Sequence, residues 1–215
     1  PRDHVGESLL PASMPVLKEL GVIAEVERSG FLPKYGATMV WGSQQDPWSW
    51  YFAETNHKYP NAFQVWRPTF DQILLENSKK HGVDVRENHQ VTSIDFLDNG
   101  PVTVNYIHQL KRKGSIEADF IVDASGSNCL LARQLNLREW DQFFQNLAVY
   151  GYFKGGSRLP EPDQTNIFIE STGNGWIWNI PLHTGVASVG AVVDSEFGQS
   201  EISRLGAKQF LIQKN

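Results

Sequence analysis

The feature that most restricts the fold is a succession of four strand-like runs in the last third of the chain. They occupy residues 146–154, 165–172, 176–182 and 186–194, and segments rich in glycine, proline and polar residues separate them. Consecutive short strands of this kind usually pair with one another as antiparallel sheet. After them, Ser200 is expected to cap a final amphipathic helix that runs to Asn215.

The first two thirds of the chain interleave helix and strand patterns. Residues 8–30 predict a helical stretch that ends at Gly30, and Pro68 opens a second helix that ends at Gly82. Strand-like runs occupy residues 36–42, 48–54, 83–87, 90–97, 102–109 and 116–124. The pattern predicts a mixed α/β (α+β) chain with a nucleotide-binding type of part and a sheet-based substrate part.

The last of these runs is expected to bring a polar turn to a sheet edge. Residues 120–122 predict a buried strand, and the turn that follows is Asp123-Ala124-Ser125-Gly126. Ligands of α/β sheets bind at the carboxyl ends of strands, and Gly126 would let a nucleotide approach closely. Arg67, next to Pro68, would suit a phosphate. The alternatives are an ordinary tight turn and an exposed arginine.

Charge and composition exclude several classes of function. The chain has 24 acidic and 19 basic residues, a net charge of −5, which gives no footprint for nucleic acid. No apolar run is long enough to span a membrane. The single cysteine excludes an internal disulfide framework, and the six histidines lack metal-ligand spacing, so we predict no metal site. The chain does not begin with methionine and shows no signal peptide, which favours a cytoplasmic piece of a longer protein.

Two features of the first third could carry chemistry. Gly6, Glu7 and Ser8 precede Pro11 at the expected start of a helix, where backbone N–H groups can hold a ligand oxygen. The alternative is a simple helix cap by Ser8. Lys34 lies among aromatic residues and glycines, where an ammonium group could be buried and reactive, although a single lysine is usually a solvated surface residue.

Two tryptophans in the last third form a further candidate. Trp176 and Trp178 lie in the segment Gly-Trp-Ile-Trp-Asn-Ile-Pro, residues 175–181. Alternate residues of a strand share a face, so the two indoles would stand side by side. They would form either a wall that excludes water or one half-buried face of a sheet.

Together and in this order, these segments resemble the flavin-dependent halogenases, a family within the FAD-dependent monooxygenase-like proteins. Residues 175–181 match the Gly-Trp-x-Trp-x-Ile-Pro signature of that family without a mismatch. Four other segments resemble family segments: residues 4–11, residues 31–42 around Lys34, residues 67–75, and residues 123–126. The resemblance covers nearly the whole chain.

The resemblance implies an enzyme that uses reduced FAD, O2 and chloride or bromide to make hypohalous acid. A separate flavin reductase would supply the reduced FAD. Lys34 would hold the hypohalous acid by a hydrogen bond, or convert it to a chloramine. Trp176 and Trp178 would form a rigid wall between flavin and substrate. The substrate would be an electron-rich aromatic molecule, free or tethered to a carrier protein; phenolic and pyrrolic compounds fit better than free tryptophan.

The resemblance also assigns residues to the cofactor. Gly6, Glu7 and Ser8 would border the isoalloxazine, and Arg67 would face the phosphates. The turn formed by Asp123, Ala124, Ser125 and Gly126 would contact the nucleotide portion. Residues 1–30 and 63–135 would form the FAD-binding part, which is Rossmann-like and partial, and residues 31–62 and 140–215 the sheet that faces the substrate.

The chain lacks the Gly-x-Gly-x-x-Gly turn that holds the pyrophosphate in this family. We therefore expect an internal fragment that would be inactive by itself. Two other functions stay open on the sequence: an FAD-dependent monooxygenase that hydroxylates without halogenating, and a non-catalytic binding domain that keeps the fold but uses no flavin.

Overall fold

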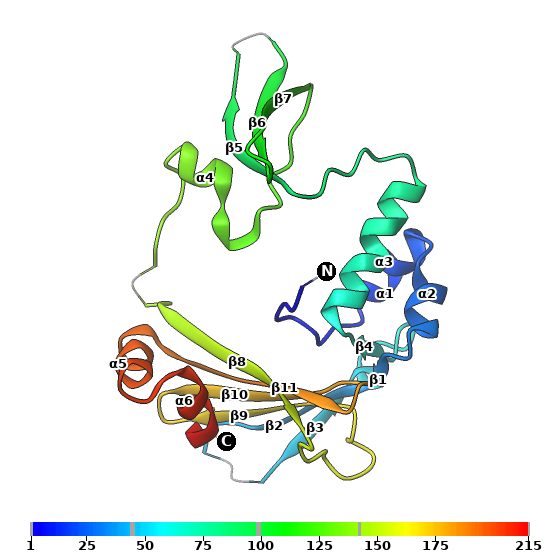
Figure 1. The fold of residues 1–215 in the computed structure, drawn as a ribbon. Helices are drawn as coiled ribbons and strands as arrows, with labels where there is room; N and C mark the ends of the chain where they lie inside the picture. Colours follow the sequence, from blue (N-terminus) through cyan, green and yellow to red (C-terminus); the bar gives the residue numbers. More distant parts are fainter. Residues whose placement is uncertain (1, 44–45, 98–99, 142, 215) are drawn as a thin grey trace. The chain divides into compact units, whose positions relative to one another are not determined.

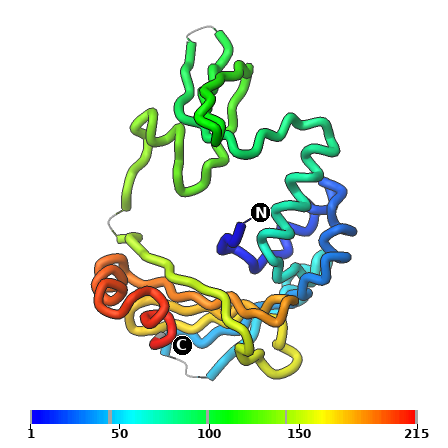
Figure 2. Tube along the Cα trace, in the orientation of Figure 1, coloured from blue at the N-terminus to red at the C-terminus, as the bar shows by residue number. Residues whose placement is uncertain are grey.

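The computed structural model describes residues 2–43, 46–97, 100–141 and 143–214. The chain divides into two compact units, the first made of residues 1–83 and 144–215 and the second of residues 84–143. Figures 1 and 2 follow the chain through both units. Helices and strands are interleaved throughout, so the prediction of a mixed α/β chain is confirmed.

The beginning of the first unit is a small helical layer on a two-stranded sheet. Its elements are α1 (Ser13–Glu19), α2 (Ile23–Arg28), β1 (Leu32–Lys34), β4 (Ala62–Gln64) and α3 (Arg67–Lys80). Leu17, Val26 and Phe70 project from the three helices into one buried cluster. Gly30 follows α2 with φ of +71°, a conformation that glycine adopts without strain, which confirms its predicted role as a helix stop.

The rest of the first unit is a six-stranded sheet with the order β3-β2-β9-β10-β11-β8. The strands are β2 (Gly36–Val40), β3 (Trp48–Tyr51), β8 (Asn146–Lys154), β9 (Ile167–Thr172), β10 (Gly175–Pro181) and β11 (Val186–Asp194), and a 3₁₀ turn (Phe52–Glu54) follows β3. The four runs predicted in the last third are all strands. Their neighbours pair antiparallel, but β2 joins β9 in parallel, so the sheet is mixed.

The two faces of this sheet have different coverings. Ile177 of β10 points to one face, where α5 (Ser195–Leu205) and α6 (Ala207–Lys214) pack through Phe197, Phe210 and Leu211. Trp178 lies one residue further along β10 and therefore points to the opposite face, among Trp176 and Tyr152. Alternation along β10 thus separates the helix-covered face from the face that carries the two tryptophans.

The second unit is smaller. It contains a three-stranded antiparallel sheet of β5 (His89–Asp95), β6 (Val102–His108) and β7 (Lys113–Ala118), followed by a 3₁₀ turn (Gly126–Asn128) and the short helix α4 (Leu130–Gln134). Ile94 and Val104 are its buried hydrophobic residues. The side-chain amide of Gln134 ties α4 to the backbone of Ile94 by two hydrogen bonds.

Two strand predictions in this region are wrong. Residues 83–87 form no strand, and β7 ends at Ala118, so residues 120–122 are not a buried strand. Phe120 and Val122 are 85% and 79% exposed. An apolar run becomes a buried strand only if neighbouring strands and a covering layer receive it, and no described residue pairs with this run.

Two helix-cap predictions are also wrong. Ser200 lies inside α5, whose cap is Asp194: Oδ1 accepts hydrogen bonds from the backbone N–H groups of Glu196 and Phe197. Gly206, with φ of +79°, separates α5 from α6. Ser8 caps no helix either, because α1 begins only at Ser13, beyond Pro11. Leu10 precedes that proline, and steric contact with the proline ring disfavours the helical conformation there.

Within the described ranges, no helix combines the length and apolar character that crossing a membrane requires. The same residues contain no group of three or more His, Cys, Asp or Glu side chains arranged to hold a metal ion.

Any side chain at Gly190 should destabilise the fold, because the Trp178 ring occupies the space that it would need. A Cβ built on Gly190 would lie 2.2 Å from Cζ2 of Trp178. We expect Gly190→Ala to lower the free energy of unfolding by about 1 to 3 kcal/mol, measured by urea denaturation. Gly173→Ala is the control, since an added Cβ there meets nothing within 4 Å. Equal stability of the two variants would contradict this packing.

Candidate functional site

Lys34 is a buried lysine at the end of β1. Its side chain is 2% exposed, and its Nζ donates a hydrogen bond to the backbone oxygen of Leu9 at 3.1 Å. The ammonium also lies 5.1 Å from the ring centroid of Phe52, within the range of a cation–π contact. Burial lowers the pKa of Lys34 to about 8. The simple alternative of a solvated surface lysine is therefore wrong.

The ammonium of Lys34 has unused hydrogen-bonding capacity. A lysine has three N–H donors, and Lys34 places one of them on Leu9. It forms no ion pair with any carboxylate in the part of the chain that the structure describes. Keeping a cation buried without a counter-charge is unfavourable. A residue held in this condition is a good candidate for binding a small polar ligand.

Residues 7–9 pair with β4 through an isolated antiparallel bridge between Ser8 and Gln64. The backbone N–H of Leu9 donates to the oxygen of Phe63, and Val65 donates to the oxygen of Glu7. This pairing is the physical reason why Ser8 is not a helix cap. The Oγ of Ser8 is buried and has no hydrogen-bond partner among the described residues, so it is free for a ligand.

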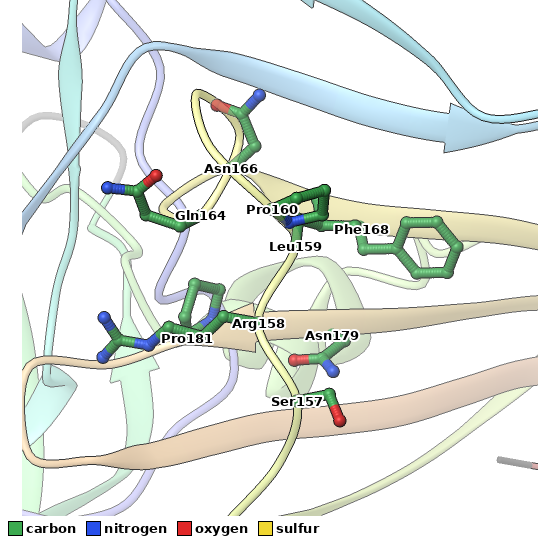
Figure 3. Close-up of a pocket in the computed structure, with 9 residues that line it drawn as sticks. All are labelled: Ser157, Arg158, Leu159, Pro160, Gln164, Asn166, Phe168, Asn179 and Pro181. Carbon is green, nitrogen blue, oxygen red and sulfur yellow. The ribbon is translucent and has the colours of Figure 1, made fainter.

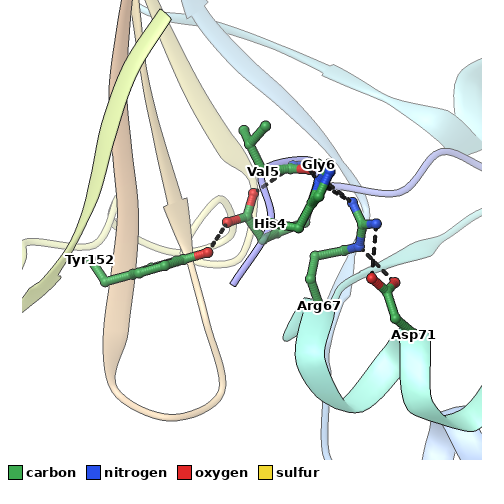
Figure 4. Close-up of polar contacts among 7 residues, drawn as sticks. His4, Val5, Gly6, Arg67, Asp71 and Tyr152 are labelled. Carbon is green, nitrogen blue, oxygen red and sulfur yellow. Dashed lines mark hydrogen bonds and ion pairs between the residues drawn. The ribbon is translucent and has the colours of Figure 1, made fainter. Parts of the chain in front are cut away.

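Glu7 is a fully buried carboxylate. Its Oε1 accepts a hydrogen bond from the hydroxyl of Tyr152 at 2.9 Å, and Oε2 accepts one from the N–H of Gly6 (Figure 4). Burial, followed by the hydrogen bond and the negative charge of Glu7, raises the pKa of Tyr152. Two residues further along, the backbone oxygen of Leu9 accepts a hydrogen bond from Lys34 of β1. The same short segment therefore connects β1, through Lys34, to β8, through Tyr152.

Arg67 holds the same segment from the start of α3. Its Nε and one terminal nitrogen donate to both carboxylate oxygens of Asp71, and Nη1 donates to the backbone oxygen of Val5 at 2.8 Å (Figure 4). A Cβ on Gly6 would come within 2.9 Å of Nη1, and the φ of Gly6 is +108°. Most of the guanidinium is therefore engaged with the protein, and this glycine allows the close approach.

The two tryptophans of β10 stand side by side, as the sequence predicts. Their ring centroids are 5.7 Å apart, with the planes inclined by 47°. Trp178 is 4% exposed and its Nε1 donates to the Oγ of Ser188 at 3.4 Å, while Trp176 is partly exposed. The pair forms a rigid aromatic surface of which one ring is anchored and the other is accessible.

In the second unit, Asp123 organises the predicted turn. Its two oxygens accept hydrogen bonds from the backbone N–H groups of Ser125 and Leu131. Hydrogen bonds from Ser125 and Leu131 lower the pKa of Asp123. Ala124 and Gly126 lie on the surface of the turn, and Gly126 has φ of +62°. Asp123 thus holds the loop in shape with its carboxylate, which stays exposed to solvent.

Ser125 lines a polar hollow of about 930 Å³ in the second unit. Its lining also includes Asp95, Arg133, amide and hydroxyl side chains of β5, α4 and the 3₁₀ turn, and the apolar Val91 and Leu130. This set of donors and acceptors suits hydroxyl and phosphate groups of a nucleotide. Apart from Ser125, these residues carry no motif, and sequence reasoning missed them because the tertiary fold gathers them from separate elements.

A second cavity, of about 270 Å³, lies in the first unit, and Figure 3 shows its lining residues. Asn179 and Pro181 of β10 contribute to its wall, together with Phe168 of β9 and the loop that contains Arg158 and Gln164. None of its lining residues was predicted as functional. For Asn179 the sequence did contain a signal. It lies in the strand that carries the family signature, at an odd position, which places it on the face opposite the two tryptophans.

Comparison with known proteins identifies the family. The family model described as tryptophan halogenase matches residues 54–212. The chain belongs to the tryptophan halogenase family. Its relatives include a tryptophan 2-halogenase of Chondromyces crocatus, 38% identical over 91% of this chain and 37% of the relative. Another is the 1H-pyrrole-2-carbonyl-[peptidyl-carrier protein] chlorinase of Pseudomonas fluorescens, 35% identical over 91% of this chain and 48% of the relative.

Solved halogenase structures share the fold of this halogenase-family chain. The myxobacterial chondrochloren halogenase CndH has a TM-score of 0.86 and 42% identity, over 93% of this chain and 46% of that one. The flavin-dependent halogenase CmlS has a TM-score of 0.91 and 33% identity, over 100% of this chain and 39% of that one. The chain spans less than half the length of each of these relatives.

The buried Lys34 should make stability depend on pH. Its pKa is about 8 in the folded chain, against 10.5 for an ordinary lysine, so the unfolded state binds more protons between these values. Stability therefore rises with pH through this window, and the full penalty, about 3 kcal/mol, applies below pH 8.

We expect the wild-type chain to gain stability relative to Lys34→Met as pH increases from 7 to about 10, measured by urea unfolding at each pH. The difference in slope is the readout, because it does not depend on how well methionine packs. Parallel stability curves would show that Lys34 titrates like an exposed lysine.

Proposed function

We propose that the protein is an FAD-dependent halogenase that makes hypohalous acid from reduced FAD, O2 and chloride or bromide. Lys34 directs the halogen to an electron-rich aromatic substrate. The observation that carries the proposal is a lysine that is buried, has no counter-charge among the described residues and has a pKa lowered to about 8. The family membership and the flavin-dependent halogenases among the relatives support it.

Lys34 can act on hypohalous acid in either of two protonation states. As an ammonium it donates a hydrogen bond to the oxygen of the acid and polarises the oxygen–halogen bond. As a neutral amine it takes the halogen: an N–H bond is replaced by an N–halogen bond, and the proton leaves with the hydroxyl as water. With a pKa of about 8, both forms are populated near neutral pH.

Trp176 and Trp178 would separate the oxidation chemistry from the substrate. A large apolar surface excludes water, which would otherwise dilute or release hypohalous acid. The anchored position of Trp178, between Gly190 behind it and Ser188 at its indole nitrogen, supports a rigid wall.

The predicted cofactor residues fit FAD to different degrees. When bound, reduced FAD supplies the electrons that activate O2. Gly6, Glu7 and Ser8 would border the isoalloxazine, and the unpaired buried Oγ of Ser8 supports this assignment. Arg67 would act chiefly by holding that segment, since Asp71 and Val5 already occupy most of its donors.

In the second unit, Asp123, Ala124, Ser125 and Gly126 would contact the nucleotide portion. Ser125 and the polar hollow that it lines support this assignment. By this reading, residues 1–30 and 63–135 belong to the cofactor part, and residues 31–62 and 140–215 to the substrate part.

The partners follow from the chemistry. A separate flavin reductase would supply reduced FAD. The substrate would be a small phenolic or pyrrolic molecule or the same group tethered to a carrier protein. A relative named as a chlorinase of a pyrrole on a peptidyl-carrier protein supports the tethered form.

The decisive experiment compares Lys34→Met with the wild type in the full-length protein, supplied with FAD, a reductase, O2 and halide. We expect Lys34→Met to lower halogenated product at least about 100-fold while flavin oxidation continues. Mass spectrometry detects the product by its halogen isotope pattern, with phenolic, pyrrolic and indole substrates offered free and carrier-bound.

Lys58→Met is the matched control, because Lys58 also lies over an aromatic ring, that of Tyr59, but is exposed. Undiminished halogenation by Lys34→Met would refute the role of Lys34. A halide-independent gain of one oxygen by the wild type would identify a hydroxylating monooxygenase instead. Absence of flavin binding by the folded protein would leave a non-catalytic binding domain.

The pH dependence of halogenation separates the two actions of Lys34. If the neutral amine takes the halogen, the rate should rise with pH and level off above about 8, the pKa of Lys34. If the ammonium donates a hydrogen bond, the rate should fall above the same pH. The measurement is the initial rate with hypohalous acid added directly, so that the flavin steps do not contribute. The concentration of un-ionised hypohalous acid is kept the same at every pH, so that its own ionisation does not shape the profile.

A further inference from the structure

Five aromatic rings form an unbroken row in the first unit. The centroid distances are 5.7 Å from Trp176 to Trp178, 6.4 Å from Trp178 to Tyr150, 6.2 Å from Tyr150 to Tyr152 and 5.0 Å from Tyr152 to Trp66. We call these five residues the aromatic row. Each separation lies within the range of direct contact between aromatic side chains.

The register of the sheet produces this row. Trp178 of β10 and Tyr150 of β8 are both paired with Gly190, which lies on the strand between them. Because this central position has no side chain, rings from the two outer strands approach each other across β11. Trp176 lies two residues before Trp178, and Tyr152 lies two residues after Tyr150, so both share the face of these rings.

The row ends at a tyrosine that has a proton acceptor. The hydroxyl of Tyr152 donates to Oε1 of Glu7 at 2.9 Å, and Glu7 is fully buried. Glu7 forms no ion pair with a basic side chain within the described residues, so no cation competes for its charge. Tyrosine loses an electron far more readily when its phenolic proton can move to a nearby base.

We propose that the aromatic row carries oxidising equivalents away from the tryptophan pair to Tyr152. An oxidised Trp176 or Trp178 regains one electron, passed along the row from Tyr152 through Tyr150. The phenolic proton of Tyr152 moves to Oε1 of Glu7 at the same time. The products are a neutral tryptophan, a neutral tyrosyl radical and a protonated Glu7, so charge and electrons balance.

The difference in ease of oxidation between the tryptophans and Tyr152 gives the electron transfer a direction. Tryptophan radical cations are stronger oxidants than a tyrosyl radical whose proton has been accepted, so the electron vacancy settles on Tyr152. Trp66, beyond Tyr152, donates to no carboxylate among the described residues, so its indole proton has no comparable base and the ring is harder to oxidise than Tyr152. The raised pKa of Tyr152 keeps its phenol protonated until oxidation occurs.

Such a path would protect the wall of a site that handles strong oxidants. The oxidant is a halogen- or oxygen-centred radical, which takes one electron from Trp176 or Trp178 and becomes an anion; its formation beside this pair rests on the proposed function. Tyr150 is 38% exposed, so a reductant in solution can reach the row and return the missing electron.

Photochemical oxidation tests the path without any halogenase activity. A ruthenium polypyridyl complex with an electron acceptor oxidises the full-length protein in a light flash, and transient absorption follows tryptophanyl and tyrosyl radicals separately. We expect the tryptophanyl signal to decay as a tyrosyl signal grows, at a rate independent of protein concentration. Electron paramagnetic resonance then identifies the tyrosyl species.

Tyr152→Phe should lower the yield of this tyrosyl phase at least about fivefold, and Glu7→Gln should slow it by removing the base. Tyr35→Phe is the matched control, because Tyr35 is exposed and makes no ring contact within the described residues. Trp178→Phe keeps a ring in place but interrupts the row, and should slow the phase even if Glu7→Gln does not fold.

An unchanged tyrosyl phase in Tyr152→Phe, or in Trp178→Phe, would overturn the proposal. Loss of the phase in Tyr35→Phe to the same extent would also overturn it, because the oxidant would then be reacting directly at the surface. The halogenase proposal can fail while this test succeeds, and the reverse also holds, since the flash experiment uses neither halide nor reduced FAD.

Discussion

The bridge that pairs residues 7–9 with β4 is the interaction on which the rest of the site depends. It places the oxygen of Leu9 where Lys34 can donate to it and the carboxylate of Glu7 where Tyr152 can reach it. Without this pairing, Lys34 and Glu7 would be buried without these hydrogen-bond partners, which is unfavourable. Arg67 holds the preceding residue, Val5, by a hydrogen bond to its backbone oxygen.

The two buried ionisable side chains, Glu7 and Lys34, differ in how fully their polar atoms are paired. Both carboxylate oxygens of Glu7 accept a hydrogen bond, one from Tyr152 and one from the N–H of Gly6. Lys34 has one backbone acceptor and the face of Phe52, and its pKa is lowered accordingly. Within one small region the fold therefore stabilises one ionisable group and leaves another ready to bind a ligand or react.

The large sheet uses its two faces for different purposes. The helices α5 and α6 cover the face that carries Ile177, where Phe210 and Leu211 pack against the sheet, and this packing supports β10 from behind. The opposite face can therefore carry large aromatic side chains in fixed positions. Gly190, between Trp178 and Tyr150, allows that density of rings at the centre of the sheet.

The amino-acid sequence by itself determined the strands of the last third, the helix that Pro68 opens and the side-by-side placement of Trp176 and Trp178. These features follow from alternation, helix-terminal residues and turn residues, all of which act between near neighbours in the chain. The family resemblance pointed to Lys34, but local physics left its burial open. Residues 120–122 show the limit, since their apolar pattern predicts a burial that they lack.

Only the tertiary structure decided the burial of Lys34, the pairing of residues 7–9 with β4 and the contact between Glu7 and Tyr152. The last of these joins residues 145 positions apart. The physical reason is that strand pairing and desolvation depend on which distant segments meet, and the spacing of residues along the chain carries no information about that meeting.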